Sequence, residues 1–135
     1  MSKYTTEQII ESVTARPGEL AGADLSGANL EKVDFPMPPY LPNVDLSKAN
    51  LCGAHLACAV LRGANLSGAY LCCAHVMGCD FTGADLSGTD LGGAHLEGAN
   101  LTGTNLSGAD MFRTTYDEKT VWPNGFTPPS NAIKV

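Results

Sequence analysis

The sequence predicts an all-β solenoid, a parallel β-helix whose four-sided coils each contain four five-residue repeats. Two observations predict it: a five-residue repeat runs through most of the chain, and longer segments recur at every fourth repeat. Five is neither the 3.6-residue period of an α-helix nor the two-residue period of a strand, so neither continuous structure fits. The composition agrees, because 15 glycines and only 16% charged residues among 135 are atypical of a helical bundle.

The five-residue repeat is built around a large apolar residue, which we call the centre. There are 17 centres, 13 of them leucine. Alanine stands two residues before the centre in 12 repeats, an Asp, Asn or His usually stands one residue before it, and glycine stands two residues after it in 11 repeats. The centres are Leu25, Leu30, Phe35, Leu46, Leu51, Leu56, Leu61, Leu66, Leu71, Val76, Phe81, Leu86, Leu91, Leu96, Leu101, Leu106 and Met111.

This repeat explains the coil. Three extended residues place the alanine and the centre on one face and the polar residue between them on the other. Two further residues must turn the chain, and glycine suits the turn because it adopts positive φ at little cost. Four turns close a square coil, and LCGAHL at 51–56, LCCAHV at 71–76 and LGGAHL at 91–96 recur at that interval. About 4.5 such coils would stack through parallel backbone hydrogen bonds.

The A(D/N)LxG pattern of residues 21–115 resembles the pentapeptide-repeat family. This resemblance implies a right-handed quadrilateral β-helix with the centre and the small residue stacked inside. It also implies a scaffold or protein-binding module without enzymatic activity. The segment YDEKTVWPNGF at 116–126 is similar to the end of many small members from photosynthetic bacteria.

Residues 1–20 are expected to hold a short capping helix. Thr5 and Gln8 have the spacing of a capping box, and Tyr4 and Ile9 have the spacing of a hydrophobic staple. The helix should begin near Thr6 and end before residue 17, which is proline.

At the other end, residues 116–135 are expected to form a C-terminal cap and tail. Tyr116 occupies the position of the last centre, and Trp122 should lie over the final coil.

An insertion, PMPPYLPN at 36–43, interrupts the β-helix of residues 21–115. The eleven residues from Phe35 to Leu46 are two repeats plus one, and the four prolines in the insertion donate no backbone hydrogen bond. We predict a one-residue bulge with a degenerate repeat around Tyr40 and Leu41. A recognition loop and a tolerated insertion both fit, and the tolerated insertion is favoured.

Charge and composition exclude several functions. The net charge of −6 disfavours nucleic acid and anionic membranes as direct partners and leaves a basic protein partner open. No apolar run approaches the ~18 residues of a membrane-spanning helix, and the opening MSKYTTEQII lacks the apolar stretch of a signal peptide. We therefore expect a cytoplasmic protein, a monomer, whose cysteines are mostly reduced.

No enzyme is expected. The sequence contains no Ser-His-Asp grouping, P-loop, dinucleotide fingerprint or HExxH motif. Its carboxylates should lie outward along a solenoid that its own side chains fill. We therefore assign no catalytic residue and no cofactor.

The histidines form the most specific pattern outside the repeat itself. His55, His75 and His95 lie four repeats apart at one repeat position, so they should stack outward ~4.8 Å apart with Asp34 beneath His55. His75 has a histidine on both sides and should therefore titrate lowest. The three are weak candidates for metal ligands, but a flat row does not converge as zinc requires. We favour the interpretation that the three histidines recur because the repeats arose by duplication, and we assign no metal site.

The cysteines occupy three environments. Cys52 and Cys72 lie one coil apart, within the Cα separation that a disulfide allows, but side chains in register point the same way, so we predict free thiols. Cys79 stands at an inward position and should be buried. Cys58 and Cys73 replace turn glycines and should be exposed.

Three functions therefore remain. A scaffold that binds another protein is favoured. The second function, suggested by the family resemblance, is a DNA-mimic inhibitor of a type II topoisomerase. It would use Asp45, Asp85, Asp90 and Asp110. Two features disfavour the DNA mimic. The rod is only ~22 Å long, and its negative charge is partly offset by basic residues: Lys32, Lys48, Arg62 and Arg113. A metal- or redox-responsive protein that uses the histidine and cysteine columns is third.

Overall fold

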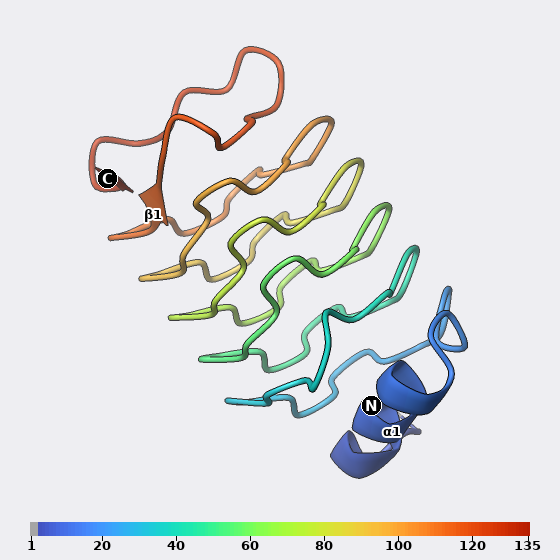
Figure 1. Ribbon diagram of the computed structural model, residues 1–135. Coiled ribbons are helices and arrows are strands. Elements are labelled where there is room, and N and C mark those ends of the chain that lie inside the picture. The colour runs from blue at the N-terminus through green and yellow to red at the C-terminus, as the bar shows by residue number, and fades with distance from the viewer. Residues whose placement is uncertain (1–2) are drawn as a thin grey trace.

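The chain winds into a solenoid whose turns stack along one axis, with a helix at one end and the C-terminus at the other (Figure 1). The structure is a computed structural model that describes residues 3–135, so the first two residues of the segment 1–20 lie outside it. Its regular elements are α1 (Thr6–Ala15), β1 (Thr115–Tyr116) and β2 (Ile133–Lys134). Residues 16–114 therefore form the body of the molecule without a named helix or strand.

Successive coils are joined by isolated parallel bridges. On each side of a coil one residue pairs with a residue of the next coil, as Asn50 pairs with Tyr70 and Tyr70 with Asp90. In the first of these pairs, the amide of Leu51 donates to the Tyr70 carbonyl at 2.7 Å and the amide of Tyr70 donates to the Ala49 carbonyl at 2.9 Å. Pairing stops after one residue because a turn follows, which explains why the predicted β-fold contains so little continuous strand.

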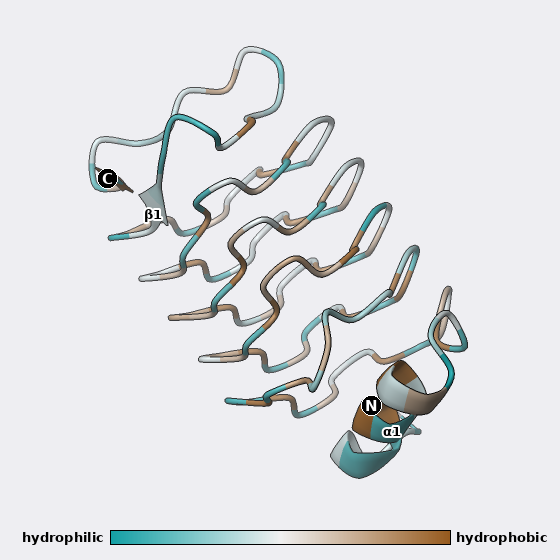
Figure 2. Cartoon of the chain, in the orientation of Figure 1, coloured by the Kyte–Doolittle hydropathy of each residue, from teal (hydrophilic) through white to brown (hydrophobic). Residues whose placement is uncertain are grey.

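The centres and the small residues fill the interior. Leu51, Leu71 and Leu91 are fully buried, as are most of the inward alanines. Apolar residues recur at matching places in successive coils (Figure 2). Where a polar residue replaces the inward alanine, its side chain donates to a backbone carbonyl of the previous coil: the Thr89 hydroxyl to Leu66 at 3.0 Å and the Cys79 thiol to Leu56 at 2.8 Å. The interior therefore accepts polar residues without leaving a buried donor unpaired.

The second residue of each two-residue corner adopts positive φ, and glycine occupies most of these positions. Cys58 and Cys73 adopt φ values of 62° and 57° there and are exposed, as predicted. Four other residues without glycine's freedom take the same conformation: Lys32, Asn43, Lys48 and Arg113.

Helix α1 begins as the capping box predicts. The Gln8 amide donates to the Thr5 hydroxyl at 3.1 Å, and the Thr5 amide donates to Gln8 Oε1 at 2.8 Å. Ile9 and Val13 are buried in the same cluster as the centres of the coils. The hydroxyl of Thr6 donates to the carbonyl of Asn29 at 2.7 Å, which ties the helix to the adjacent coil.

The insertion contains one extra residue at a single corner of the coil. Asp34 pairs with His55 and Tyr40 pairs with Val60, so the first pair is separated by one residue more than the second. Leu41 is buried as a centre and the backbone of Tyr40 enters the ladder, so the predicted bulge and degenerate repeat are confirmed. Residues 36–38 form a three-residue corner where the next three coils have two, at 57–58, 77–78 and 97–98.

A second extra residue, which the repeat pattern did not reveal, lies at the same corner near the C-terminus. Asn100 pairs with Val121, one residue further along than the regular coil would place its partner. The corner is formed by residues 117–119, and Thr120 then points inward, where its hydroxyl donates to the Leu96 carbonyl at 3.0 Å. The ladder therefore continues past Tyr116, which was expected to hold the last centre position.

The C-terminal tail returns to the final coil. Strand β1 pairs in parallel with β2, with Thr115 opposite Ile133. Trp122 packs against the core, with its ring 5.3 Å from the rings of both Tyr116 and Phe126. Trp122 is thus partly buried against the core at the C-terminal end of the solenoid.

Candidate functional site

The outward residue that precedes each centre has a structural task in much of the molecule. At eleven of these positions an Asp or Asn side chain accepts the backbone N–H two residues later, which fixes the turn. In Asn65, for example, Oδ1 accepts from the Ser67 amide at 3.0 Å and from the Ser67 hydroxyl at 2.7 Å. The eleven are Asp24, Asn29, Asp45, Asn50, Asn65, Asp80, Asp85, Asp90, Asn100, Asn105 and Asp110.

This task is distributed unevenly among the four sides of the coil. On one side, which we call the serine face, all five outward residues make the turn bond and a serine stands two residues after each of them: Asp24, Asp45, Asn65, Asp85 and Asn105. Two sides further along the coil lies the histidine face: Asp34, His55, His75, His95 and Thr115. None of these five makes the turn bond in the described structure. Their side chains are free of the task that Asp and Asn perform elsewhere.

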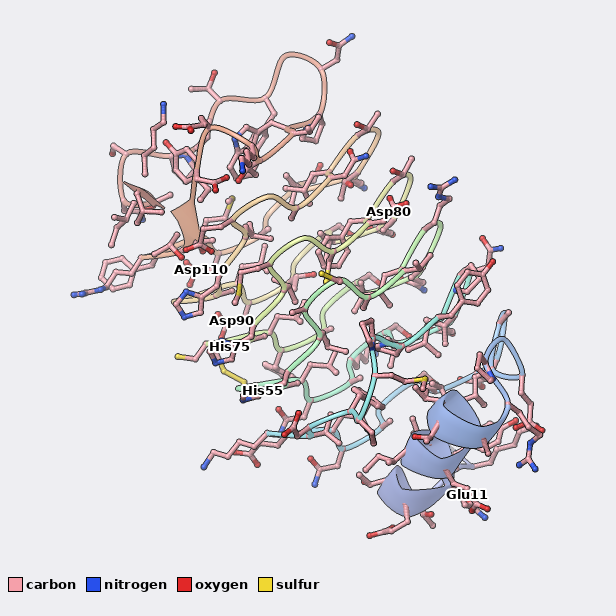
Figure 3. The ribbon with its side chains drawn as sticks, in the orientation of Figure 1. Glu11, His55, His75, Asp80, Asp90 and Asp110 are labelled. Atoms are coloured by element: carbon pink, nitrogen blue, oxygen red, sulfur yellow. A yellow bond between two sulfur atoms is a disulfide. The ribbon has the colours of Figure 1, made fainter. Side chains whose placement is uncertain are left out.

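The three imidazoles stack along the histidine face. The ring centroids of His55 and His75 lie 4.5 Å apart, and those of His75 and His95 lie 5.0 Å apart with their planes 19° from parallel. Asp34 pairs with His55 in the ladder, as predicted. In Figure 3, His55 and His75 lie one above the other on the same side of neighbouring coils.

The middle histidine has a perturbed pKa. Burial of His75 between its neighbours lowers its pKa below the ordinary value of 6.5, the charges of His55 and His95 lower it further, and Glu97 opposes the shift. The direction for His75 agrees with the expectation, although desolvation rather than repulsion is the larger cause. At neutral pH the stack therefore presents a neutral imidazole at its centre.

The last histidine has a defined hydrogen-bond network. The Thr115 hydroxyl donates to Glu97 Oε1 at 2.7 Å, and His95 Nδ1 lies 3.1 Å from the same hydroxyl oxygen. Because Thr115 uses its proton on Glu97, it accepts from His95, which places the proton of the neutral ring on Nδ1 and leaves the lone pair on Nε2. Glu97 Oε2 is buried without a hydrogen-bond partner within residues 3–135.

The geometry of the face bears on metal binding. Across residues 3–135, no group of three or more His, Cys, Asp or Glu side chains is placed to hold a metal ion together. Rings stacked in a row present their nitrogens side by side, whereas zinc prefers ligands that converge on one point. The face instead offers a line of hydrogen-bonding groups to another surface.

One prediction for the cysteines was wrong. Cys52 and Cys72, predicted to be free thiols, form a disulfide that joins neighbouring coils, with their Cα atoms 4.6 Å apart. The regular ladder brings the two backbones close enough for the bond, and the objection that the side chains run parallel does not hold at this corner. Cys79 is buried as predicted, and burial raises the pKa of its thiol to about 12.

Hollows lie where the chain departs from the regular repeat. One lies beside α1 and the segment that follows it, and its lining includes Gln8, Ser12 and Leu20. One of about 260 Å³ lies at the insertion, beside Asp34 and His55, and one of about 420 Å³ lies between His95 and Ile133 of the tail. Two of these hollows flank the histidine face at its two ends. In the described part of the chain, no helix is long and apolar enough to cross a membrane.

Comparison with sequence families gives one match. A family described as pentapeptide repeats matches residues 19–36, 41–75 and 79–115 in eight copies, about two thirds of the chain. A search of curated proteins finds no match.

Two solved structures are similar over most of the chain. The crystal structure of a pentapeptide repeat protein from the cyanobacterium Cyanothece 51142 is 37% identical, covers 73% of this chain and gives a TM-score of 0.50. A pentapeptide repeat protein from Nostoc PCC 7120 is 36% identical; the match covers 91% of this chain and 88% of that protein, with a TM-score of 0.38. This chain spans 60% of the length of the Cyanothece protein.

Proposed function

Because this chain belongs to the pentapeptide-repeat family, whose members fold as right-handed quadrilateral β-helices, we propose that it is a non-enzymatic scaffold that binds another protein. We propose the histidine face as its binding surface. One observation carries this proposal: the five outward residues of the serine face all stabilise turns, and the five of the histidine face do not. Side chains that stabilise no turn are available for contact with a partner.

The chemistry of the face suits protein recognition. His55 is exposed and His75 and His95 are half-buried, so partner atoms can reach all three rings. Neutral imidazoles both donate and accept hydrogen bonds and carry apolar ring surface. Rings held at 4.5–5.0 Å by the ladder are also preorganised, which lowers the entropy cost of binding.

The architecture that presents this face is part of the proposal. We propose a rod of about 4.5 regular coils over residues 21–115, closed by the capping segment 1–20 and by the cap and tail 116–135. The burial of Ile9 and Val13 from α1, and of part of Trp122, in the core cluster supports the two caps. Covered ends prevent the open edges of the outer coils from pairing with other chains, so we propose a monomer.

We also propose a cytoplasmic location, which the redox state of the Cys52–Cys72 pair in the cell can test. A bond between Cys52 and Cys72 persists in an oxidising compartment and is reduced in an ordinary cytosol. Alkylation of free thiols in intact cells, followed by mass spectrometry, distinguishes the two states. Reduced Cys52 and Cys72 would support the cytoplasm, and an oxidised pair would contradict it.

The function is tested by affinity capture from extracts of the native organism with three forms of the protein. The first is the wild type, and the second carries His55→Asn, His75→Asn and His95→Asn. The matched control alters three residues of the serine face while it keeps every turn acceptor: Asn65→Asp, Asp85→Asn and Asn105→Asp. We expect the control to retain the partner and the histidine variant to lose it. Equal capture by all three forms would contradict the proposal.

A further inference from the structure

Asp34 differs from every other aspartate in the described structure. The chain has eight aspartates, and seven of them accept at least one backbone N–H. Asp34 accepts none and has no ion pair within residues 3–135. The cause lies two residues later in the chain, where the other turns supply an N–H and this one has Pro36, which has none. Within residues 3–135, both carboxylate oxygens of this exposed side chain are therefore without a hydrogen-bond or ion-pair partner.

A groove with both polar and apolar lining opens beside this carboxylate. It is lined by Asp34, Phe35, Pro36, Met37, Pro38, His55 and Ala57 and has a volume of about 260 Å³. This volume is below the ~300–1,000 Å³ typical of small-molecule pockets, so the groove suits one long side chain. Met37 in its wall is 41% exposed.

The groove is a feature of this chain rather than of the repeat. Its wall is the three-residue corner 36–38, where the next coils have two-residue corners, and residues 37–40 lie outside the family match. An extra residue at one corner costs the ladder little, because pairing resumes between Tyr40 and Val60. The insertion therefore adds this groove without interrupting the ladder.

We propose that this groove binds an arginine side chain of the partner protein, with Asp34 as its counter-ion. The proposal rests on the proposed scaffold function and names the chemistry of the partner. Two free carboxylate oxygens match the two parallel donors of a guanidinium. Pro36, Met37 and Pro38 in the lining offer apolar surface to the stem of the side chain. The net charge of −6 attracts a basic segment to this surface.

Two matched peptides test the proposal without the natural partner. The first is N-acetyl-Leu-Arg-amide, and the second replaces arginine with citrulline, which keeps the shape and lacks the charge. Titration into the labelled protein at low salt, followed by NMR, should give saturable shifts at Met37, His55 and Ala57 with the arginine peptide. We expect the affinity for the arginine peptide to exceed that for the citrulline peptide about two- to fivefold. This is the gain in affinity that an exposed ion pair usually gives.

Asp34→Asn should remove this difference between the peptides. The control Asp24→Asn removes the same charge from the same coil and keeps its turn acceptor, so it should leave the difference unchanged. Shifts that do not saturate, equal affinity for both peptides, or an effect of Asp24→Asn as large as that of Asp34→Asn would each overturn the proposal. So would groove signals that shift with protein concentration alone, because the occupant would then be a second copy of this chain.

Failure of this inference and failure of the scaffold function are distinguishable. If wild type and Asp34→Asn capture the same partner equally well while the triple histidine variant captures none, the scaffold function stands and the arginine groove is wrong. Saturable, Asp34-dependent binding of the arginine peptide supports the groove whatever the histidine variant captures.

Discussion

Within the described part of the chain, the outward residues of the serine face form turn bonds and those of the histidine face do not. Two reciprocal substitutions should therefore change the free energy of unfolding by different amounts. Asn65→His puts a histidine on the serine face, and His75→Asn puts the turn-forming residue on the histidine face. Both positions are half-buried and precede a buried centre in the same register. The two substitutions therefore exchange the same two residue types in similar surroundings.

The expected magnitudes follow from the hydrogen bonds. Asn65→His removes an acceptor of two bonds, from the Ser67 amide and the Ser67 hydroxyl. At about 0.5–1.5 kcal/mol net for each bond, the free energy of unfolding should fall by about 1–3 kcal/mol. His75→Asn gains one bond, because the Met77 amide has no acceptor in the described structure, and loses two ring contacts. These terms offset, so its change should lie within about 0.5 kcal/mol of zero, as for an ordinary surface substitution.

Urea unfolding at pH 8, above the ordinary histidine pKa of ~6.5, measures both changes. The two variants should keep the m-value of the wild type, since neither alters the buried surface. A loss above about 1.5 kcal/mol in His75→Asn, more than one hydrogen bond is worth, would show that the histidines stabilise the fold. An Asn65→His variant as stable as the wild type would show that the turn bonds do not contribute to the stability of the fold. Either result would refute the reasoning.

The remaining predictions concern the core, the disulfide, titration and charge mimicry. Leu66→Lys should unfold the protein, because it places an unpaired charge at a fully buried centre, whereas Ser67→Lys should cost below about 1.5 kcal/mol; equal melting of the two would show that the faces are misassigned. Reduction of the Cys52–Cys72 bond, which closes a loop of about 20 residues, should lower the free energy of unfolding by about 3 kcal/mol in urea, and a double serine variant should be insensitive to reductant. Because folding lowers the His75 pKa, the unfolded chain takes up the proton first, so stability should fall as the pH drops from about 6.5 towards the folded pKa; an NMR titration that places His75 above 6.5 would contradict this. The protein should not inhibit gyrase supercoiling at micromolar concentration and low salt, and clear inhibition would favour the DNA-mimic function instead.

The periodic parts of the fold could be predicted because burial is periodic. Every fifth residue is a centre that must point inward, so the ladder and the stacking of His55, His75 and His95 follow from counting. The start of α1 was predictable for a local reason, since Thr5 and Gln8 satisfy each other's amides.

Departures from the period were harder to predict. The second extra residue lies in 117–119, where no Ala or Gly marks the repeat, and the only signal was a small polar residue at Thr120 before Val121. The disulfide was missed because perfect stacking of Cys52 and Cys72 was assumed to keep their sulfurs parallel.

Part of the candidate site was visible in the sequence without being recognised. An Asp or Asn one residue before a centre, with a residue other than proline two positions later, signalled the turn bond, and the repeats of the histidine face lack this combination. Thr115 lies four repeats after His95 and so belonged to the column by counting. The contact of Thr115 with Glu97 could not be predicted, because it depends on side-chain conformation.

Amide hydrogen exchange on the complex with the captured partner tests the binding surface most directly. Two residues after each histidine lies a backbone amide that has no acceptor in the described structure, in Ala57, Met77 and Glu97. These three amides should exchange fast in the free protein. We predict that the partner slows their exchange and leaves the amides of Ser67 and Ser87 on the serine face unchanged. Protection on the serine face alone, or no protection on the histidine face, would contradict the account.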